Sequence, residues 1–138
     1  MTTHAIDVTV RWSDADPAGI VFYPRFFAWY DLGTESLFES LGLPWPETFE
    51  RYGIVGVPIV ECGSTFLSPV RYGDVATLRS TVSWVKDKTF RMDHDIGVGR
   101  RACARGFEVR AWVRRPDPPG GALRAESIPA AVRDRLGG

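Results

Sequence analysis

The chain has 138 residues, of which 44% are hydrophobic and 25% are charged. These values are ordinary for a globular protein, and the length predicts one domain over residues 1–138 with a substantial core. The 17 basic and 17 acidic residues cancel, which argues against a general nucleic-acid or anionic-membrane binder and is compatible with an oligomer.

The first predicted element is a half-buried strand over residues 5–12, because apolar and polar residues alternate there. Its apolar face would consist of Ile6, Val8, Val10 and Trp12. Residues 13–23 follow as an acidic turn that contains Asp14, Asp16 and a Pro-Ala-Gly sequence.

The apolar spacing then changes to that of a long amphipathic helix over residues 24–41. Pro24 suits the first helical position and Gly42 suits the C-terminal cap. Gly33 lies in the middle of this helix, where it costs about 1 kcal/mol relative to alanine. A close approach between the helix and a sheet is one reason for a glycine at this position.

The rest of the chain predicts mostly strands. Residues 43–56 form a connection with room for a short helix, and a second short helix is expected near residues 129–136. Between them lie strands at about 57–68, 74–86, 89–98 and 101–115, separated by turn sequences. One strand, a long helix and four strands predict an α+β domain, with a curved antiparallel sheet wrapped around the helix.

The cysteines and histidines predict neither a disulfide nor a metal site. Cys62 and Cys103 lie in separate strand-like segments, so two buried free thiols in a reducing cytosol are expected. His4 and His94 lack the spacing of zinc ligands. The polar N-terminus and the absence of a long apolar run predict a cytoplasmic protein that does not bind membranes.

The acidic turn carries the strongest chemical signal. It places Asp16 just before the N-terminus of the long helix, where free backbone N–H groups can stabilise an anion. A carboxylate beside an oxyanion site is a minimal apparatus for hydrolysing an activated acyl group. An isolated Asp-x-Asp-Pro sequence is also a common turn, so these residues alone leave a purely structural role open.

The sequence Asp14-Ala-Asp16-Pro-Ala-Gly-Ile-Val-Phe-Tyr-Pro, followed by the long helix, resembles the hotdog-fold acyl-CoA thioesterases of the Pseudomonas 4-hydroxybenzoyl-CoA type. Weaker likeness continues through Leu43-Pro-Trp45, Gly56-Val-Pro-Ile-Val60 and Tyr72-Gly-Asp74-Val. The resemblance implies a five-stranded antiparallel sheet around a central helix. It also implies edge-to-edge dimers with active sites at the interface, and commonly a dimer of dimers.

The resemblance also assigns roles to individual residues. It implies that Asp16 is the catalytic carboxylate and that the backbone N–H of Tyr23 polarises the thioester carbonyl. It places Trp45 and the Val57-Pro58-Ile59 backbone against the ligand. No cofactor and no metal are implied.

The turn Lys86-Asp87-Lys88 falls where relatives bind the nucleotide phosphates of coenzyme A with basic side chains. Asp87 departs from the basic family type, so phosphate binding would need other residues. Arg91, or Arg100 with Arg101, are candidates for that compensation.

Several alternatives to these roles stay open. Asp14 is expected to bind turn N–H groups, and Tyr23 to use its backbone and not its hydroxyl. Glu35 and Glu39 are possible catalytic acids on the helix by analogy with another thioesterase branch, and Glu61 can approach a site. The aromatic residues that would line a slot for an aryl group, or else the core, are Phe22, Phe26, Trp29 and Trp45.

The expected function is hydrolysis of an aryl-CoA thioester such as 4-hydroxybenzoyl-CoA. Short-chain or branched aliphatic acyl-CoA esters are the second possibility, and acyl carrier protein thioesters the third. A non-catalytic binder of coenzyme A esters is the alternative from another functional class.

Overall fold

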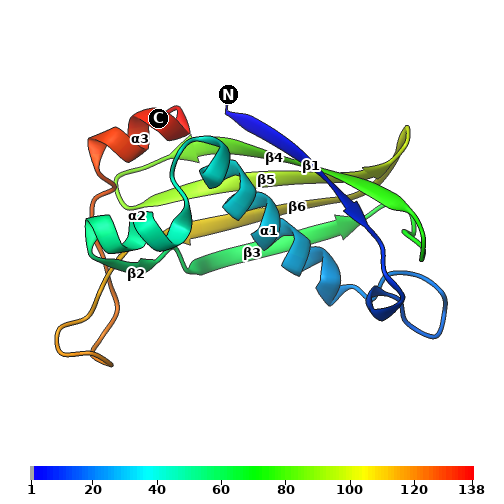
Figure 1. Ribbon diagram of the computed structural model, residues 1–138, viewed down its shortest axis with the longest axis horizontal. Helices are drawn as coiled ribbons and strands as arrows, with labels where there is room; N and C mark the ends of the chain where they lie inside the picture. The colour runs from blue at the N-terminus through cyan, green and yellow to red at the C-terminus, as the bar shows by residue number, and fades with distance from the viewer. Residues whose placement is uncertain (1) are drawn as a thin grey trace.

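The computed structural model describes residues 2–138 and contains a long central helix lying across a curved sheet (Figure 1). Helix α1 spans Pro24–Ser40, close to the predicted 24–41. The sheet has five antiparallel strands in the order β1-β4-β5-β6-β3. Their bounds are β1 Thr3–Thr9, β3 Ile59–Phe66, β4 Val75–Val85, β5 Thr89–Val98 and β6 Arg101–Ala111. The predicted α+β hotdog architecture is therefore confirmed.

A second, three-stranded sheet was not expected from the sequence. It consists of β2 Ile54–Gly56, β7 Val113–Arg114 and β8 Arg124–Ala125, in the order β2-β7-β8. The predicted strand 101–115 was wrong as one unit, because it divides at Trp112, whose N–H donates to the Lys88 carbonyl. The predicted strand 57–68 instead begins at Ile59, after Pro58, which has no N–H to donate to a ladder.

Two short helices complete the chain. Helix α2 covers Trp45–Tyr52, inside the region where a short helix was an option, and α3 covers Ala130–Leu136, as predicted. A single 3-10 turn, η1, spans Trp12–Asp14 and ends the first strand earlier than predicted. Because the chain turns here, Trp12 is 78% exposed and does not continue the apolar face of the strand.

The core consists of two clusters between α1 and the sheet, and the first of them extends to Val132 and Leu136 of α3. The first surrounds Leu37 and Phe38 near the end of α1, and the second surrounds Phe26 and Tyr30 near its beginning. Gly33 lies between them at a close approach to the sheet. A Cβ there would lie 2.9 Å from Leu78 Cδ2 and closer still to Ser80 Oγ, which confirms the predicted reason for a glycine.

The cysteines only partly follow the prediction. Both are free, but Cys62 is exposed and only Cys103 is buried. Cys62 is exposed because it lies on β3, an edge strand whose outer side has no neighbour in residues 2–138. None of the helices in the described residues is long and apolar enough to cross a membrane.

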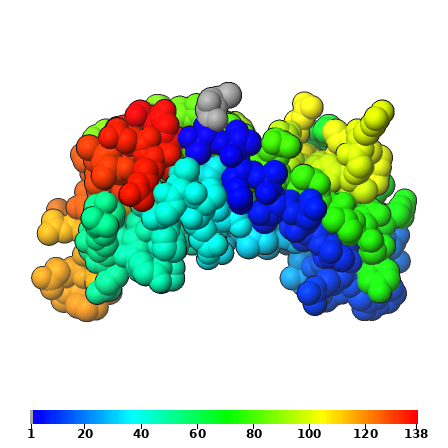
Figure 2. Space-filling model, turned by 45° about the horizontal axis from the view of Figure 1, so that its top comes forward, coloured from blue at the N-terminus to red at the C-terminus, as the bar shows by residue number. Residues whose placement is uncertain are grey.

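The two ends of the molecule are separated by the length of α1. The acidic turn lies at one end, near the start of α1, and α2, β2 and the β7–β8 hairpin lie at the other (Figure 1). In the space-filling view the two ends project as separate lobes with α1 between them (Figure 2).

Candidate active site

The acidic turn folds as a small hairpin that leads into α1. Ala15 bridges Val21, and the Phe22 N–H donates to the Asp14 carbonyl at 2.8 Å. Gly19 closes the hairpin with a φ of +79°, in the left-handed region where a side chain would be strained. The hairpin fixes Asp16 and Tyr23 on one short, hydrogen-bonded segment.

The Asp16 carboxylate is half-buried and has one oxygen available. Its Oδ1 accepts the Ala18 N–H at 2.9 Å, which orients the side chain, whereas Oδ2 has no hydrogen bond within residues 2–138. The carboxylate borders a hollow of about 440 Å³ that also exposes the rings of Trp12 and Tyr72. An oriented carboxylate with a free oxygen can act as a nucleophile or as a general base.

Tyr23 is the N-cap residue of α1 and supplies a free backbone donor. In the described residues its N–H has no hydrogen-bond acceptor, and the next residue, Pro24, has no N–H. The Tyr23 side chain is 60% exposed and borders a mainly apolar hollow of about 380 Å³ with Phe26, Phe66 and Leu67. A free N–H at a helix N-terminus suits the oxygen of a polarised carbonyl, since the helix dipole favours negative charge there.

The structure gives Asp14 the structural role that was expected. Its Oδ2 accepts the Arg11 N–H at 2.9 Å, and its Oδ1 lies 3.8 Å from Arg25 Nε. Arg25 in turn donates to the Ser13 carbonyl at 3.2 Å. These contacts hold the turn against the first turn of α1 and leave Asp16 as the acid that faces the hollow.

In the folded molecule, the predicted ligand residues lie at the opposite end from Asp16 and Tyr23 (Figure 1). Trp45 begins α2 and packs on Phe49 with ring centroids 5.7 Å apart, and its Nε1 is buried without a partner in residues 2–138. Val57 is buried and the side chain of Ile59 is exposed at the start of β3. One chain therefore does not bring together all the residues that the resemblance assigns to the site.

The turn Lys86-Asp87-Lys88 joins β4 to β5 at this second end, with all three side chains exposed. Lys86 Nζ lies 4.5 Å from the centroid of the Trp84 ring. The main chain of the turn is well anchored, because the Asp87 carbonyl accepts the Ile128 N–H at 2.8 Å. The turn therefore presents two cations and one anion from a hydrogen-bonded main chain.

The proposed compensating arginines do not serve this turn within one chain. Arg100 and Arg101 lie at the other end of β5, and Arg101 is held by the Pro69 carbonyl and by Asp74. Arg91 is near the turn, but it pairs with Asp93 at 3.2 Å and covers the Phe107 ring at 4.2 Å. Within one chain, none of these three arginines is therefore both close to the turn and unpaired in residues 2–138.

The aromatic residues do not form one slot within a chain. Phe26 and Trp29 are buried in the core, Phe22 is half-exposed beside Tyr23, and Trp45 is at the far end. Of the alternative acids, Glu39 and Glu61 are exposed and Glu35 is half-buried. None of the three has an ion pair or a side-chain hydrogen bond in the described residues.

A buried polar network beneath α1 was not predicted from the sequence. Glu108 Oε1 accepts the Thr34 hydroxyl at 2.5 Å and lies 3.1 Å from His94 Nε2. Arg110 donates to Glu108 Oε2 at 2.8 Å and to Asp31 on α1 at 2.6 Å. In the sequence, Glu108 and Arg110 alternate with Val109 on one strand. This pattern is equally typical of charged residues that face solvent.

The network carries a strongly perturbed carboxyl group. Burial alone would raise the pKa of Glu108, but hydrogen bonds from His94 and Arg110, with the Arg110 charge, hold it at about 2. The same guanidinium donates to the Val57 carbonyl at 3.0 Å. Arg110 thereby ties the central helix to the predicted ligand segment at the start of β3.

Comparisons with known proteins show the family to which the chain belongs. The family model of the thioesterase-like superfamily matches residues 10–136. The chain is 33% identical to 4-hydroxybenzoyl-CoA thioesterase from Pseudomonas sp. (strain CBS-3) over 127 residues, 88% of each chain.

Two solved structures extend the likeness. An Asp-to-Asn mutant of 4-hydroxybenzoyl-CoA thioesterase, complexed with 4-hydroxybenzoyl-CoA, matches with a TM-score of 0.91 and 29% identity over 99% of both chains. A gentisyl-coenzyme A thioesterase matches with a TM-score of 0.82 and 32% identity, covering 94% of this chain and 99% of that one. By fold and by sequence, the chain belongs to the thioesterase-like superfamily.

Proposed function

We propose that this protein hydrolyses acyl-CoA thioesters, with Asp16 as the catalytic carboxylate. The observation that carries the proposal is that one short segment holds two groups without a hydrogen bond in residues 2–138: Oδ2 of Asp16, and the N–H of Tyr23 at the start of α1. An attacking group and an oxyanion donor are what a thioester requires, because its thiolate leaves readily without a general acid.

Two routes use these groups. Asp16 can attack the thioester carbonyl, expel the coenzyme A thiolate and form a mixed anhydride, which water then opens to release the acid and restore the carboxylate. It can instead take a proton from the water that attacks the carbonyl. In both routes the carbonyl oxygen gains negative charge, which the Tyr23 N–H and the helix dipole stabilise.

The complete site requires two copies of the chain. Strand β3 is an edge strand of eight residues with exposed apolar side chains, and Val60 is 61% exposed. Such an edge is a template for pairing. An antiparallel β3–β3 contact about a two-fold axis brings the Asp16 end of one copy to the Trp45 end of the other, twice per dimer. We propose that two such dimers then associate into a tetramer.

The preferred substrate in this proposal is an aryl-CoA thioester, with 4-hydroxybenzoyl-CoA first. The two relatives at or above 30% identity described above act on hydroxybenzoyl and gentisyl thioesters, both aromatic. The apolar hollow beside Tyr23, lined by Phe26, Phe66 and Leu67, supports an apolar acyl group next to the catalytic hairpin. Trp45 and the backbone of residues 57–59 of the second copy would complete the pocket.

The decisive experiment measures release of free coenzyme A from benzoyl, 4-hydroxybenzoyl, butyryl and palmitoyl thioesters by wild type and Asp16→Asn. We expect the aryl esters to have the highest kcat/KM, and the variant to lose at least about 10³-fold in kcat. The matched control is Asp7→Asn, which replaces an exposed aspartate on β1. Preference for butyryl-CoA would retain the chemistry and reject the aryl assignment. Full activity in Asp16→Asn would reject the catalytic role.

A further inference from the structure

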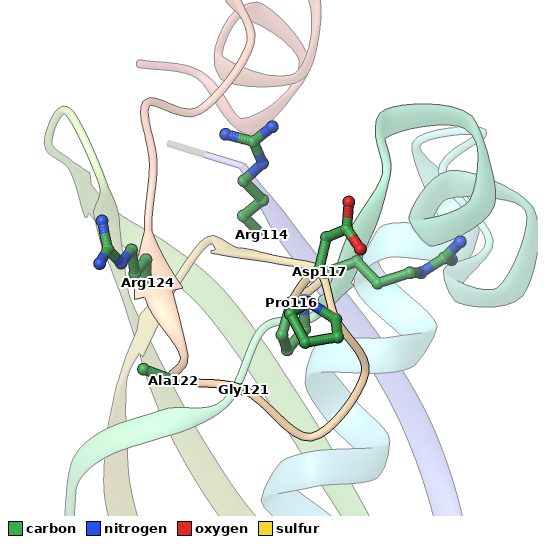
Figure 3. Close-up of a pocket in the computed structure, with 8 residues that line it drawn as sticks. Arg114, Pro116, Asp117, Gly121, Ala122 and Arg124 are labelled. Atoms are coloured by element: carbon green, nitrogen blue, oxygen red, sulfur yellow. The ribbon is translucent and has the colours of Figure 1, made fainter.

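Arg110 is buried, whereas the arginines that follow it toward the β7–β8 hairpin are exposed. Arg114 and Arg124 border an open hollow of about 450 Å³ (Figure 3). Arg110 is 4% exposed and directs its donors into the fold. Burial of a charged group is costly, and apolar residues of similar volume can replace a buried ion pair without loss of stability. A role other than stability is therefore expected for this guanidinium.

The guanidinium of Arg110 joins three parts of the chain. Nη1 donates to the Val57 carbonyl at 3.0 Å, and Nη2 donates to Asp31 Oδ1 on α1 at 2.6 Å. Nε and Nη2 also donate to the two carboxylate oxygens of Glu108, at 3.2 Å and 2.8 Å. Such a two-point contact between a guanidinium and a carboxylate fixes the plane of the arginine. The Glu108 contact thus sets the direction in which Arg110 meets the other two segments.

The contact with Val57 matters because the sheet holds this segment only in part. Pro58 has no N–H, and the register of β3 against β6 shifts just after Ile59. No backbone N–H in residues 2–138 donates to the Val57 carbonyl, so the guanidinium satisfies a group that the sheet leaves out. Its central carbon also lies 5.4 Å from the centroid of the Trp45 ring. Arg110 therefore contacts both of the predicted ligand elements.

We propose that Arg110 is a positioning residue for the acyl group and that it acts across the dimer. In this arrangement Arg110 of one copy fixes the ligand segment that faces Asp16 of the second copy. The inference rests on the proposed thioesterase function and on the proposed β3–β3 contact, which brings the Trp45 end of one copy to the Asp16 end of the other. Arg110 touches no reacting atom and acts through the Val57 carbonyl and the Trp45 ring.

The first test separates positioning from stability. Glu108→Gln/Arg110→Met removes both buried charges, whereas Glu108→Gln keeps the arginine and its donors to Val57 and Asp31. Because the single variant leaves a buried guanidinium without its main partner, the double variant should be at least as stable in urea denaturation. We expect the double variant to lose about 100-fold in kcat/KM for the preferred acyl-CoA, since a displacement of about 1 Å has effects of that size.

Two comparisons complete this test. Glu108→Gln should lose less than about tenfold in kcat/KM, because its arginine still reaches the ligand segment. The matched control is Arg105→Met, which replaces an exposed arginine on the same strand and should match wild type. Activity and stability then fall in opposite orders in the single and double variants, which a purely structural role of Arg110 would not produce.

The second test mixes two defective copies. Asp16→Asn and Glu108→Gln/Arg110→Met are co-expressed in equal amounts, so that the two kinds of copy pair at random. If Arg110 acts across the dimer, about a quarter of the sites combine an intact Asp16 from one copy with an intact Arg110 from the other. We expect the mixture to regain about a quarter of the wild-type kcat/KM. If both residues of a site belonged to one copy, no site would be intact and the mixture would stay as inactive as its parents.

Several results would overturn the proposal. A wild-type kcat/KM in the double variant would reject it while leaving the thioesterase function intact, and so would a Glu108→Gln variant that is less active than the double variant. A mixture without recovered activity would reject action across the dimer. If wild type hydrolyses no thioester, the proposed function fails, and calorimetric titration with benzoyl-CoA decides the role of Arg110. Weaker binding by the double variant than by Glu108→Gln would then support positioning, and equal binding would reject it.

Discussion

The buried carboxylate of Glu108 gives the sharpest prediction about stability. Burial acts to raise its pKa, but hydrogen bonds from His94 and Arg110 outweigh burial and hold the pKa at about 2, against an ordinary value of 4.5. Since the folded-state pKa is the lower one, ionised Glu108 stabilises the fold above about pH 4.5, and this contribution is lost as the pH falls toward 2. The shift corresponds to about 3 kcal/mol at pH 7.

Glu108→Gln keeps the shape of the side chain and removes its charge. We expect the free energy of unfolding to fall by about 3 kcal/mol at pH 7, similar to the loss when one partner of a buried ion pair is removed. At pH 3 wild type has lost most of the advantage, so the difference should shrink to about 1 kcal/mol. Urea denaturation at one fixed protein concentration, with the slope m compared between variants, measures both values.

The control for this experiment is Glu50→Gln. Glu50 pairs with Arg115 at 3.4 Å on the surface, so its replacement should change stability by less than about 1 kcal/mol at either pH. A difference for Glu108→Gln that stays the same between pH 3 and pH 7 would refute the electrostatic account. A loss below about 1 kcal/mol at pH 7 would show that the network contributes little to stability.

Two further substitutions test the packing of α1 and the assembly. Gly33→Ala should lower the free energy of unfolding by about 2 kcal/mol, because the new alanine Cβ would overlap Leu78 and Ser80. A Tm equal to that of wild type would contradict this close packing of α1 on the sheet. Val60→Lys on the β3 edge should give monomers by light scattering and at least about 100-fold lower kcat/KM, whereas Val75→Lys on β4 should remain oligomeric. An active monomer would refute the shared site.

The sequence predicted those elements whose signals are local. Helix α1 was placed within one residue at its C-terminal end, because Pro24 and the apolar spacing mark it clearly. The two faces of β4 also follow the local alternation, since Ala76 and Leu78 are buried whereas Thr77 and Arg79 are exposed. The end of β1 was misplaced, because Trp12 continues the alternation although the chain has already turned.

The features that the sequence did not predict depend on contacts between distant segments. The second sheet exists because Arg114 and Arg124 meet across a Pro- and Gly-rich loop, which by sequence pattern alone marks the end of a strand. The polar network joins residues of α1 to residues on β5 and β6, and no local pattern reports that Glu108 faces inward. The residues of the candidate site stay a prediction from the family resemblance, and no local pattern reports that they lie at two ends of one molecule.

Arg110 connects the stability of the fold to the geometry of the candidate site. A buried Arg–Glu pair is seldom required for stability, since apolar residues of similar volume can serve as well. An apolar residue at this position would fill the space but would donate nothing to the Val57 carbonyl or to Asp31. Because hydrogen bonds are directional, the guanidinium fixes the segment that begins β3 relative to α1. The buried charges beneath the helix therefore hold the predicted ligand segment in one position relative to the helix that begins at Tyr23.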